Sequence, residues 1–203
     1  FNLNTELSDF YTAYRADRPE VGMWAQDWTL PEPTADSYTD EMMANAKEFS
    51  DTAMVVITRV GGEGADLPTD VSKVTYTDNS TEYKDFEAGE HYLQLDRTER
   101  DMLDLVCSNF DNVIVVYNGA NAMELGFINE YSQIKSAIWC PGTGQSGFEA
   151  LGEIVAGTVN PSGKTSDTFV ADLTATPTWN NFGYFKYDNM DEYAYTSNNF
   201  KTC

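Results

Sequence analysis

The chain has 203 residues, of which 12 are Lys or Arg and 33 are Asp or Glu, giving a formal net charge of -21 at pH 7. This charge repels nucleic-acid phosphates and anionic lipid, and no basic patch offsets it, so we expect no nucleic acid as a partner and no binding to a membrane surface. With 41% hydrophobic residues the chain can build one globular core, while no apolar run approaches the roughly 18 residues of a membrane span.

Residues 1–39 are expected to form an N-terminal arm or linker that leads into the main domain. Their first part predicts a short amphipathic helix, because apolar side chains recur there at helical spacing. These are Leu3, Leu7, Phe10, Tyr11 and Tyr14. The following stretch, 30–38, is rich in Pro and Asp and predicts turns. Since the chain opens on Phe1, we expect it to be a piece of a longer polypeptide.

Three apolar runs predict the strands of the main domain, which we place at residues 40–185. They lie at 51–60, 112–119 and 134–142 and are rich in Val and Ile. Continuous runs of this kind are typical of parallel strands that are buried on both faces.

Two helices are predicted before and after the first of these strands. The first begins after Thr39, a suitable N-cap residue. The second, over 97–110, begins with a capping box in which Asp96 and Glu99 satisfy each other's backbone N–H groups. Its predicted apolar face consists of Met102, Leu103, Val106 and Phe110.

Two further helices are predicted later in the chain. Asn121 and Glu124 have the spacing of a capping box for a helix over 121–133. Another helix, over 146–157, should stop at Gly157. Strands alternating with helices predict right-handed βαβ units, so the fold class is α/β, a three-layer sandwich with a mainly parallel β-sheet and helices on both faces. Residues 186–203 are expected to be a tail.

Residues 60–95 interrupt this alternation, because about three dozen residues follow the first strand without a helical pattern, against an ordinary two to six or so. Long loops at the carboxyl end of a parallel strand are usually functional. The glycines of 61–64 would turn sharply and present Glu63 at the edge of the sheet. A phosphate cradle fits poorly, because Glu63, Asp66 and Asp70 would repel phosphate. A solvated surface loop is the alternative.

The segment Gly142–Gly147 reads G-T-G-Q-S-G and matches a nucleotide-binding fingerprint, with Asp167 at a suitable distance downstream. It follows the last clear strand rather than the first, however, and Pro141 precedes it. We therefore favour glycines that let the helix pack tightly against the strand. A nucleotide-binding doubly wound domain is the less favoured alternative.

The single histidine and the three cysteines give no sign of a metal or a cofactor. His91 has no second His and no Ser or Cys nucleophile in a recognisable motif, so we expect a solvated surface residue. Cys107, Cys140 and Cys203 are scattered, which argues against a disulfide framework and a structural zinc site. No metal ligands are assigned, and no cofactor is expected.

Four short blocks, in order along the chain, carry a resemblance to a known family. They are Arg59 with Gly62-Glu63-Gly64 after the first strand, Asn118-Gly119 after the second, the turn 139–147 after the third, and Asn160-Pro161-Ser162-Gly163-Lys164. Together they resemble the second, C-terminal type α/β sandwich domain of glycoside hydrolase family 3, as found in β-glucosidase-like enzymes. The last block is the most specific of the four.

The resemblance implies a domain or fragment of a retaining β-glycosidase that acts on a β-glucoside or oligosaccharide. It implies that Glu63 is the general acid/base, and that Arg59, Gly62, Gly64 and Asp66 bind substrate. The nucleophile is implied to lie on a (β/α)8 barrel domain of the same parent chain, so we expect this segment to be inactive without that barrel. A non-catalytic carbohydrate-binding or scaffolding module is the alternative from a different class, because a fold does not settle a function.

Overall fold

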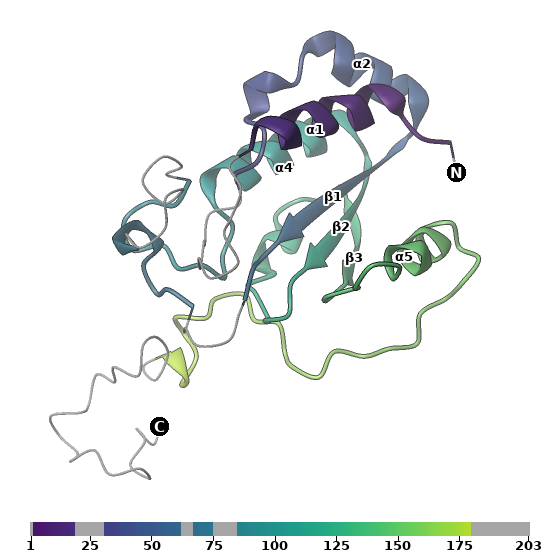
Figure 1. The fold of residues 1–203 in the computed structure, drawn as a ribbon. Helices are drawn as coiled ribbons and strands as arrows, with labels where there is room; N and C mark the ends of the chain where they lie inside the picture. Colours follow the sequence, from purple (N-terminus) through teal and green to yellow (C-terminus); the bar gives the residue numbers. More distant parts are fainter. Residues whose placement is uncertain (1, 19–30, 62–66, 75–84, 180–203) are drawn as a thin grey trace, which may run out of the picture.

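A parallel three-stranded sheet forms the centre of the structure, a computed structural model that describes residues 2–18, 31–61, 67–74 and 85–179. The strands are β1 (Thr52–Thr58), β2 (Asn112–Asn118) and β3 (Ile134–Trp139), hydrogen-bonded in the order β1-β2-β3 (Figure 1). The three predicted strands are confirmed. Their carboxyl ends lie at one edge of the sheet, where the connections that follow β1, β2 and β3 begin.

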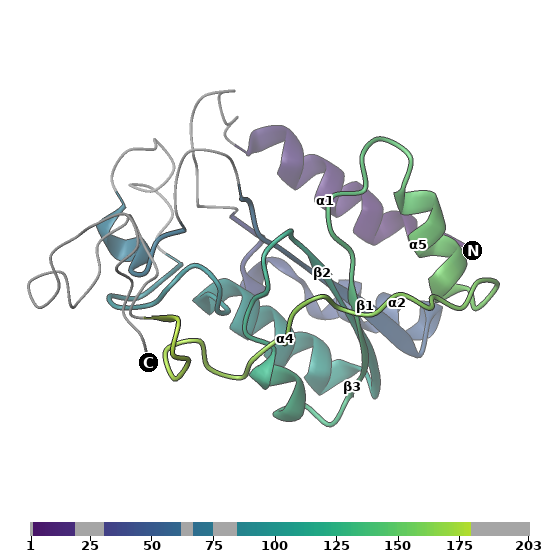
Figure 2. The same cartoon turned by 90° about the horizontal axis from the view of Figure 1, so that it is seen from below.

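Within the described ranges, four α-helices and three short 3-10 helices lie around this sheet. They are α1 (Thr5–Asp17), η1 (Ala35–Ser37), α2 (Asp40–Phe49), η2 (Val71–Lys73), α4 (Arg97–Asn109), η3 (Gly126–Asn129) and α5 (Phe148–Val155). Figure 2 shows α4 on one side of the sheet and α1 and α5 on the other. The predicted α/β sandwich is therefore confirmed.

Local sequence signals explain where the helices begin and end. The Thr39 hydroxyl accepts a hydrogen bond from the Met42 N–H at 3.1 Å and starts α2. Asp96 and Glu99 form the predicted capping box of α4. Gly157, with φ of 71°, follows the end of α5 in the left-handed conformation that glycine adopts without strain. These predictions are confirmed.

The helix predicted over 121–133 does not form, and only the 3-10 helix η3 is found there. In a helix capped by Asn121, the Leu125 N–H would bond to the Asn121 carbonyl. That carbonyl instead accepts the Tyr117 hydroxyl at 2.6 Å, and the Leu125 N–H bonds to Val170 at 3.1 Å. Tertiary partners have therefore replaced the first bond of the predicted helix.

The two faces of the sheet are covered unequally. Val55 and Ile57 of β1 point to the face on which α4 packs and are 3% and 1% exposed. Met54 and Val56 point to the opposite face and are 49% and 43% exposed. The prediction that the strands are buried on both faces is therefore wrong for β1 and also for β3, in which Lys135, Ser136 and Ala137 are exposed.

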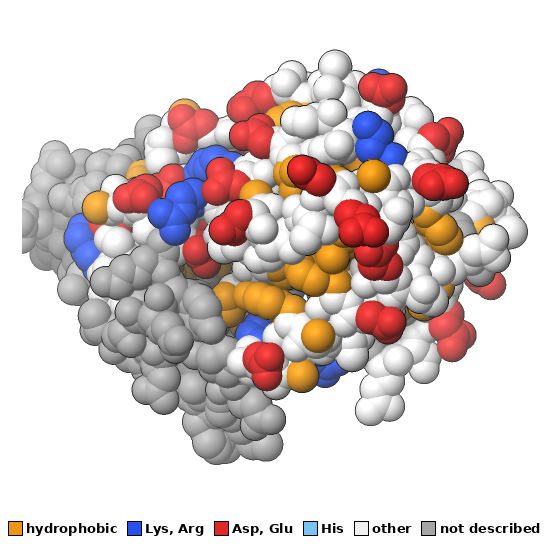
Figure 3. Space-filling model, turned by 90° about the horizontal axis from the view of Figure 1, so that it is seen from above, with side chains coloured by type: hydrophobic (Ala, Val, Ile, Leu, Met, Phe, Trp, Pro, Cys, Tyr) orange, Lys and Arg blue, Asp and Glu red, His pale blue; other side chains and the backbone are white. Residues whose placement is uncertain are grey.

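Carboxylates outnumber basic side chains on the face that Figure 3 shows. Figure 3 shows Asp and Glu side chains scattered over one face of the molecule, with few Lys and Arg side chains between them. This distribution follows from the net charge of -21. None of the helices in the described ranges is long and apolar enough to cross a bilayer.

Candidate functional site

The candidate site lies at the carboxyl end of β1, where Arg59 is the first residue after the strand. Its side chain is 3% exposed and continues the row of Val55 and Ile57 on the face toward α4. A guanidinium has five N–H donors. The three donors that meet backbone carbonyls reach Thr58 at 2.8 Å, Tyr92 at 2.7 Å and Gln94 at 2.5 Å.

The two remaining donors form a bidentate ion pair with Glu99. Arg59 Nη1 and Nη2 lie 2.6 Å from Glu99 Oε1 and Oε2, respectively. Glu99 Oε2 also accepts the Asp96 N–H at 3.0 Å, and Asp96 Oδ1 accepts the Glu99 N–H at 2.7 Å. All five guanidinium donors thus have protein acceptors. Direct sugar binding by Arg59 stays a prediction, and it would require one of these bonds to open.

Two aromatic rings enclose the same guanidinium. Its central carbon lies 5.4 Å from the ring centroid of Tyr92 and 5.8 Å from that of Phe86. The Tyr92 hydroxyl accepts a hydrogen bond from the Val60 N–H at 2.8 Å, so one tyrosine contacts both the Arg59 side chain and the next residue's backbone. At Gly61 a Cβ atom would lie 2.6 Å from Asn121 Nδ2, so a larger residue would displace the end of the Asn121 side chain.

The other predicted site residues, Gly62, Glu63, Gly64 and Asp66, lie outside the described residues. Of the predicted set, the structure therefore places Arg59 alone. Their roles as acid/base and substrate-binding residues stay predictions.

Two carboxyl groups near Arg59 have raised pKa values that the sequence did not indicate. Burial, followed by the nearby charge of Glu99, raises the pKa of Asp96 to about 8. The same two causes, in the same order, raise the pKa of Glu32 to about 7. Glu32 approaches this site from the arm, 27 residues before Arg59 in the sequence. Because no local pattern reports such proximity, Glu32 was missed as a candidate acid.

His91 is buried rather than solvated, so the sequence prediction for it is wrong. It is 1% exposed, and its ring lies 5.0 Å from that of Trp179. Its Nε2 lies 2.9 Å from Glu124 Oε1, which also accepts the Leu173 N–H at 2.6 Å. His91 and Glu124 together hold the segment that follows α5 against the loop that precedes α4.

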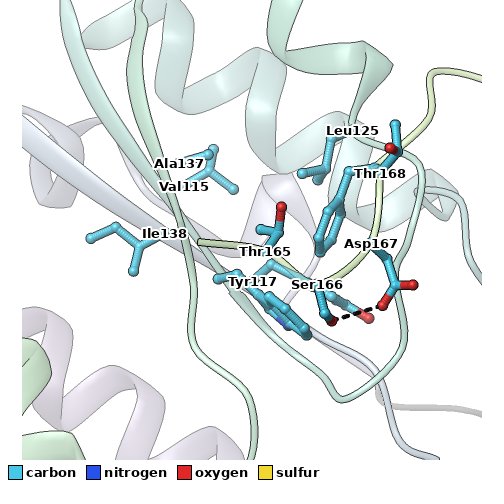
Figure 4. A pocket seen from close by; sticks show the side chains of 11 residues that line it. Val115, Tyr117, Leu125, Ala137, Ile138, Thr165, Ser166, Asp167 and Thr168 are labelled. Atoms are coloured by element: carbon cyan, nitrogen blue, oxygen red, sulfur yellow. Dashed lines mark hydrogen bonds between the residues drawn. The ribbon is translucent and has the colours of Figure 1, made fainter. Parts of the chain in front are cut away.

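A cavity of about 540 Å³ lies beside this segment, between the sheet and residues 165–169. Figure 4 shows side chains of β2 and β3 on one wall and Thr165, Ser166, Asp167 and Thr168 on the other. The Trp139 and Phe169 rings also line it, with centroids 5.3 Å apart. Ser166 donates a hydrogen bond to Asp167 at 2.9 Å. The cavity has a size suited to a small ligand.

The glycine-rich segment Gly142–Gly147 forms the turn between β3 and α5. A Cβ atom on Gly147 would lie 2.4 Å from the Thr143 carbonyl oxygen, whereas nothing lies within 4 Å of one on Gly142. Gly144 has φ of 63°. Gly144 and Gly147 are thus needed for the turn itself, whereas Gly142 has room for a side chain, and close packing of the helix against the strand is not what requires the two glycines.

Thiols and possible metal ligands are dispersed. Cys107 is buried and Cys140 partly buried, and both are free. Within the ranges that the structure describes, no group of three or more His, Cys, Asp or Glu side chains is arranged to hold a metal ion.

Comparison with known proteins identifies the family. The glycosyl hydrolase family 3 C-terminal domain matches residues 5–200. β-Glucosidase A of Butyrivibrio fibrisolvens is 33% identical over 183 residues, covering 85% of this chain and 21% of that protein. A β-glucosidase of Ruminococcus albus is 27% identical over 183 residues, covering 89% and 17%.

A solved structure agrees with these relatives. The crystal structure of a β-glucosidase from Paenibacillus barengoltzii superimposes with a TM-score of 0.68 at 30% identity, over 89% of this chain and 18% of that one. The chain thus spans about a fifth of the length of the relatives it matches. From the extent of the family match, the chain belongs to the glycosyl hydrolase family 3 C-terminal domain family.

Proposed function

We propose that this chain is the part of a retaining β-glycosidase that supplies the general acid/base, Glu63, and part of the sugar cleft. The observation that carries the proposal is the family match over residues 5–200, together with relatives that are β-glucosidases. The buried Arg59 supports it, because it anchors the end of β1 four residues before Glu63. Gly62, Gly64 and Asp66 are proposed to contact the sugar.

In the proposed reaction, a neutral Glu63 protonates the glycosidic oxygen while a second carboxylate attacks the anomeric carbon. The aglycone leaves with this proton, and a glycosyl-enzyme ester remains. Glu63, now a carboxylate, takes a proton from the water that attacks the anomeric carbon and so releases the sugar. The second carboxylate is proposed to come from a (β/α)8 barrel domain elsewhere in the parent chain.

The test is Glu63→Gln in the intact parent enzyme. The amide preserves shape but removes the proton donor, so substrates with poor leaving groups should lose several powers of ten in rate, in order of magnitude. Dinitrophenyl glucosides need little protonation and should be slowed far less in the glycosylation step. Azide should restore turnover and give a β-glycosyl azide.

Two further variants complete this test. Glu87→Gln changes an exposed carboxylate of the same connection and should leave all rates unchanged. Glu32→Gln tests the carboxyl whose pKa is about 7. If Glu63→Gln slows all substrates equally, azide has no effect, and Glu32→Gln shows the leaving-group dependence, the acid/base role belongs to Glu32.

A non-catalytic carbohydrate-binding module is the second candidate, and the cavity beside Trp139 and Phe169 favours it. The two aromatic rings suit the apolar face of a sugar, and the hydroxyls and carboxylate of 165–168 suit its hydroxyl groups. Calorimetric titration of this chain with cellobiose tests it, because binding should be lost in Asp167→Asn. Asp172→Asn, in the same segment but away from the cavity, is the matched control.

A further inference from the structure

The described part of the N-terminal arm, residues 2–18 and 31–39, packs against the body of the domain. The short helix η1 lies against α4, and Tyr38, the residue after η1, packs against the hydrophobic core. The Tyr38 and Tyr11 hydroxyls share a hydrogen bond of 2.6 Å, and the Tyr38 ring lies 5.0 Å from that of Phe10. These contacts tie α1 to the end of the arm.

Glu32 enters this interface between two prolines. Pro31 and Pro33 are both buried, Pro33 with less than 2% of its surface exposed, and Glu32 itself is half-buried. Proline restricts its own backbone and that of the residue before it, so Glu32 has few conformations in which it could turn away. The carboxyl group of Glu32 therefore stays close to the body as long as the arm is docked.

Arg59, a buried cation of the body whose charge acts on Glu32, has no donor left for it. Two of its five N–H groups bond to the Glu99 carboxylate at 2.6 Å, and the other three bond to backbone carbonyls. An ionised Glu32 would thus add a second negative charge beside a guanidinium that is already paired, without a hydrogen bond from it.

The other charged groups that face Glu32 do not bind it to the body. Asp85, in the connection before α4, adds negative charge, and Arg18 follows the end of α1 and so moves with the arm. Burial is the main cause that raises the pKa of Glu32 to about 7, followed by the charge of Glu99, although Arg18 and Arg59 oppose the shift.

The remaining ionisable groups of these elements change this balance little around neutral pH. Tyr11 and Tyr38 stay neutral, because burial raises the pKa of both hydroxyls. Asp96, at the beginning of α4, has a pKa of about 8, raised mainly by burial. The Arg97 side chain is 57% exposed, so water screens its charge.

A carboxyl group in this setting is accommodated when neutral and repelled when ionised. We propose that Glu32 is a pH-sensitive switch, whose neutral form keeps the arm docked on α4 and whose ionised form favours its release. In the released arm its pKa returns toward the ordinary 4.5, so docking is strongest below about pH 4.5 and weakens as the pH rises through about 7. The inference does not depend on the proposed function.

Amide hydrogen exchange of the 203-residue chain at pH 5 and pH 8 tests this switch. The amides of α1 report docking, because a helix of 13 residues is marginal in water on its own. Their protection, corrected for the intrinsic exchange rate at each pH, should fall by about tenfold or more between the two pH values. The Val113 N–H, which bonds to the Gln133 carbonyl at 2.8 Å, reports the core.

Two variants separate the titration of Glu32 from other effects of pH. Glu32→Gln is neutral at both pH values, so the α1 amides should keep most of their protection at pH 8. Asp9→Asn removes an exposed carboxylate of α1 and is the matched control, which should lose protection as the wild type does. A loss of protection in Glu32→Gln as large as in the wild type would overturn the proposal.

Two measurements on the wild type keep the proposal testable even if Glu32→Gln does not fold. If the α1 amides exchange no faster than the Val113 amide, the arm opens only when the whole domain unfolds, and the switch is overturned. The chemical shift of the Glu32 carboxyl carbon follows its ionisation directly. A midpoint well above 4.5, with loss of α1 protection over the same pH range, supports the switch, and a midpoint near 4.5 overturns it.

Discussion

The Nε2 atom of His91 donates a hydrogen bond to Glu124 Oε1 over 2.9 Å, while its Nδ1 accepts one from the Leu93 N–H at 3.1 Å. Because Nδ1 accepts, the ring is in the tautomer with its proton on Nε2. The Leu173 N–H shares the same Glu124 oxygen at 2.6 Å. Three segments that are far apart in sequence thus meet at one carboxylate.

Glu124→Ala should therefore destabilise the chain by about 2 to 4 kcal/mol, because it leaves the buried His91 N–H and the Leu173 N–H without acceptors. Chemical denaturation measures this loss, and hydrogen exchange at the Leu173 amide should accelerate. Glu130→Ala, an exposed carboxylate in the following turn, serves as the control and should change stability little. Unchanged exchange at Leu173 in Glu124→Ala would contradict the prediction.

Asp96→Asn should weaken the dependence of stability on pH. Burial raises the pKa of Asp96 to about 8 from the ordinary 3.8, so in the folded state the carboxyl binds a proton more tightly than in the unfolded chain. This stabilisation is fully present below about pH 4 and is lost as the pH rises through about 8. Asn keeps an N-cap acceptor but does not titrate.

Melting temperatures at about pH 5 and pH 9 test this prediction. The wild type should lose about 4 kcal/mol more stability over this range than Asp96→Asn does, at about 1.4 kcal/mol per pH unit up to the folded-state pKa. Asp101→Asn, on the exposed side of α4, should behave as the wild type. Glu99, Arg59 and Asp85, whose charges act on Asp96 in the wild type, are present in all three proteins, so a difference in pH dependence between them reports the ionisation of Asp96 itself. Parallel pH profiles for the wild type and Asp96→Asn would refute the assignment.

Gly147→Ala should destabilise the chain by about 1 to 3 kcal/mol, since the new Cβ would lie 2.4 Å from the Thr143 carbonyl oxygen. Gly152→Ala is the matched control, because it lies inside α5 with nothing within 4 Å of its Cβ position. There alanine should stabilise by about 0.5 to 1 kcal/mol. Urea denaturation measures the free energy of unfolding of both variants, which should fall in Gly147→Ala and rise in Gly152→Ala. NAD should not raise the melting temperature of the wild type, and a clear rise would favour the nucleotide-binding alternative.

The 203-residue chain alone should hydrolyse aryl β-glucosides no faster than a blank. The two carboxylates of a retaining site act as a unit, and the proposed nucleophile lies elsewhere in the parent chain. Release of nitrophenol from its β-glucoside measures the activity, with the parent enzyme as the positive control. Turnover at an ordinary enzyme rate would contradict the prediction, provided that the identically purified Glu63→Gln chain shows none.

Structural features that depend on residues only a few positions apart in the sequence were predicted well. The strand at 112–118 was found because its apolar run is continuous, and α4 because Asp96 and Glu99 satisfy each other three residues apart. The ordered blocks of residues 59–164 also sufficed to recognise the family, which the family match confirms. The roles assigned to Glu63 and its neighbours stay predictions.

By itself the sequence determined the α/β class and the positions of the three strands along the chain, since both follow from periodicity and from the local chemistry of caps and turns. Only the tertiary structure decided that Glu99 pairs with Arg59 and that His91 is buried against Glu124. It also decided that residues 121–133 form no α-helix, because Tyr117 and Val170 take the partners that its first bond needs. These contacts join groups 4 to 45 residues apart, and their free energy depends on burial and alignment that no local pattern encodes.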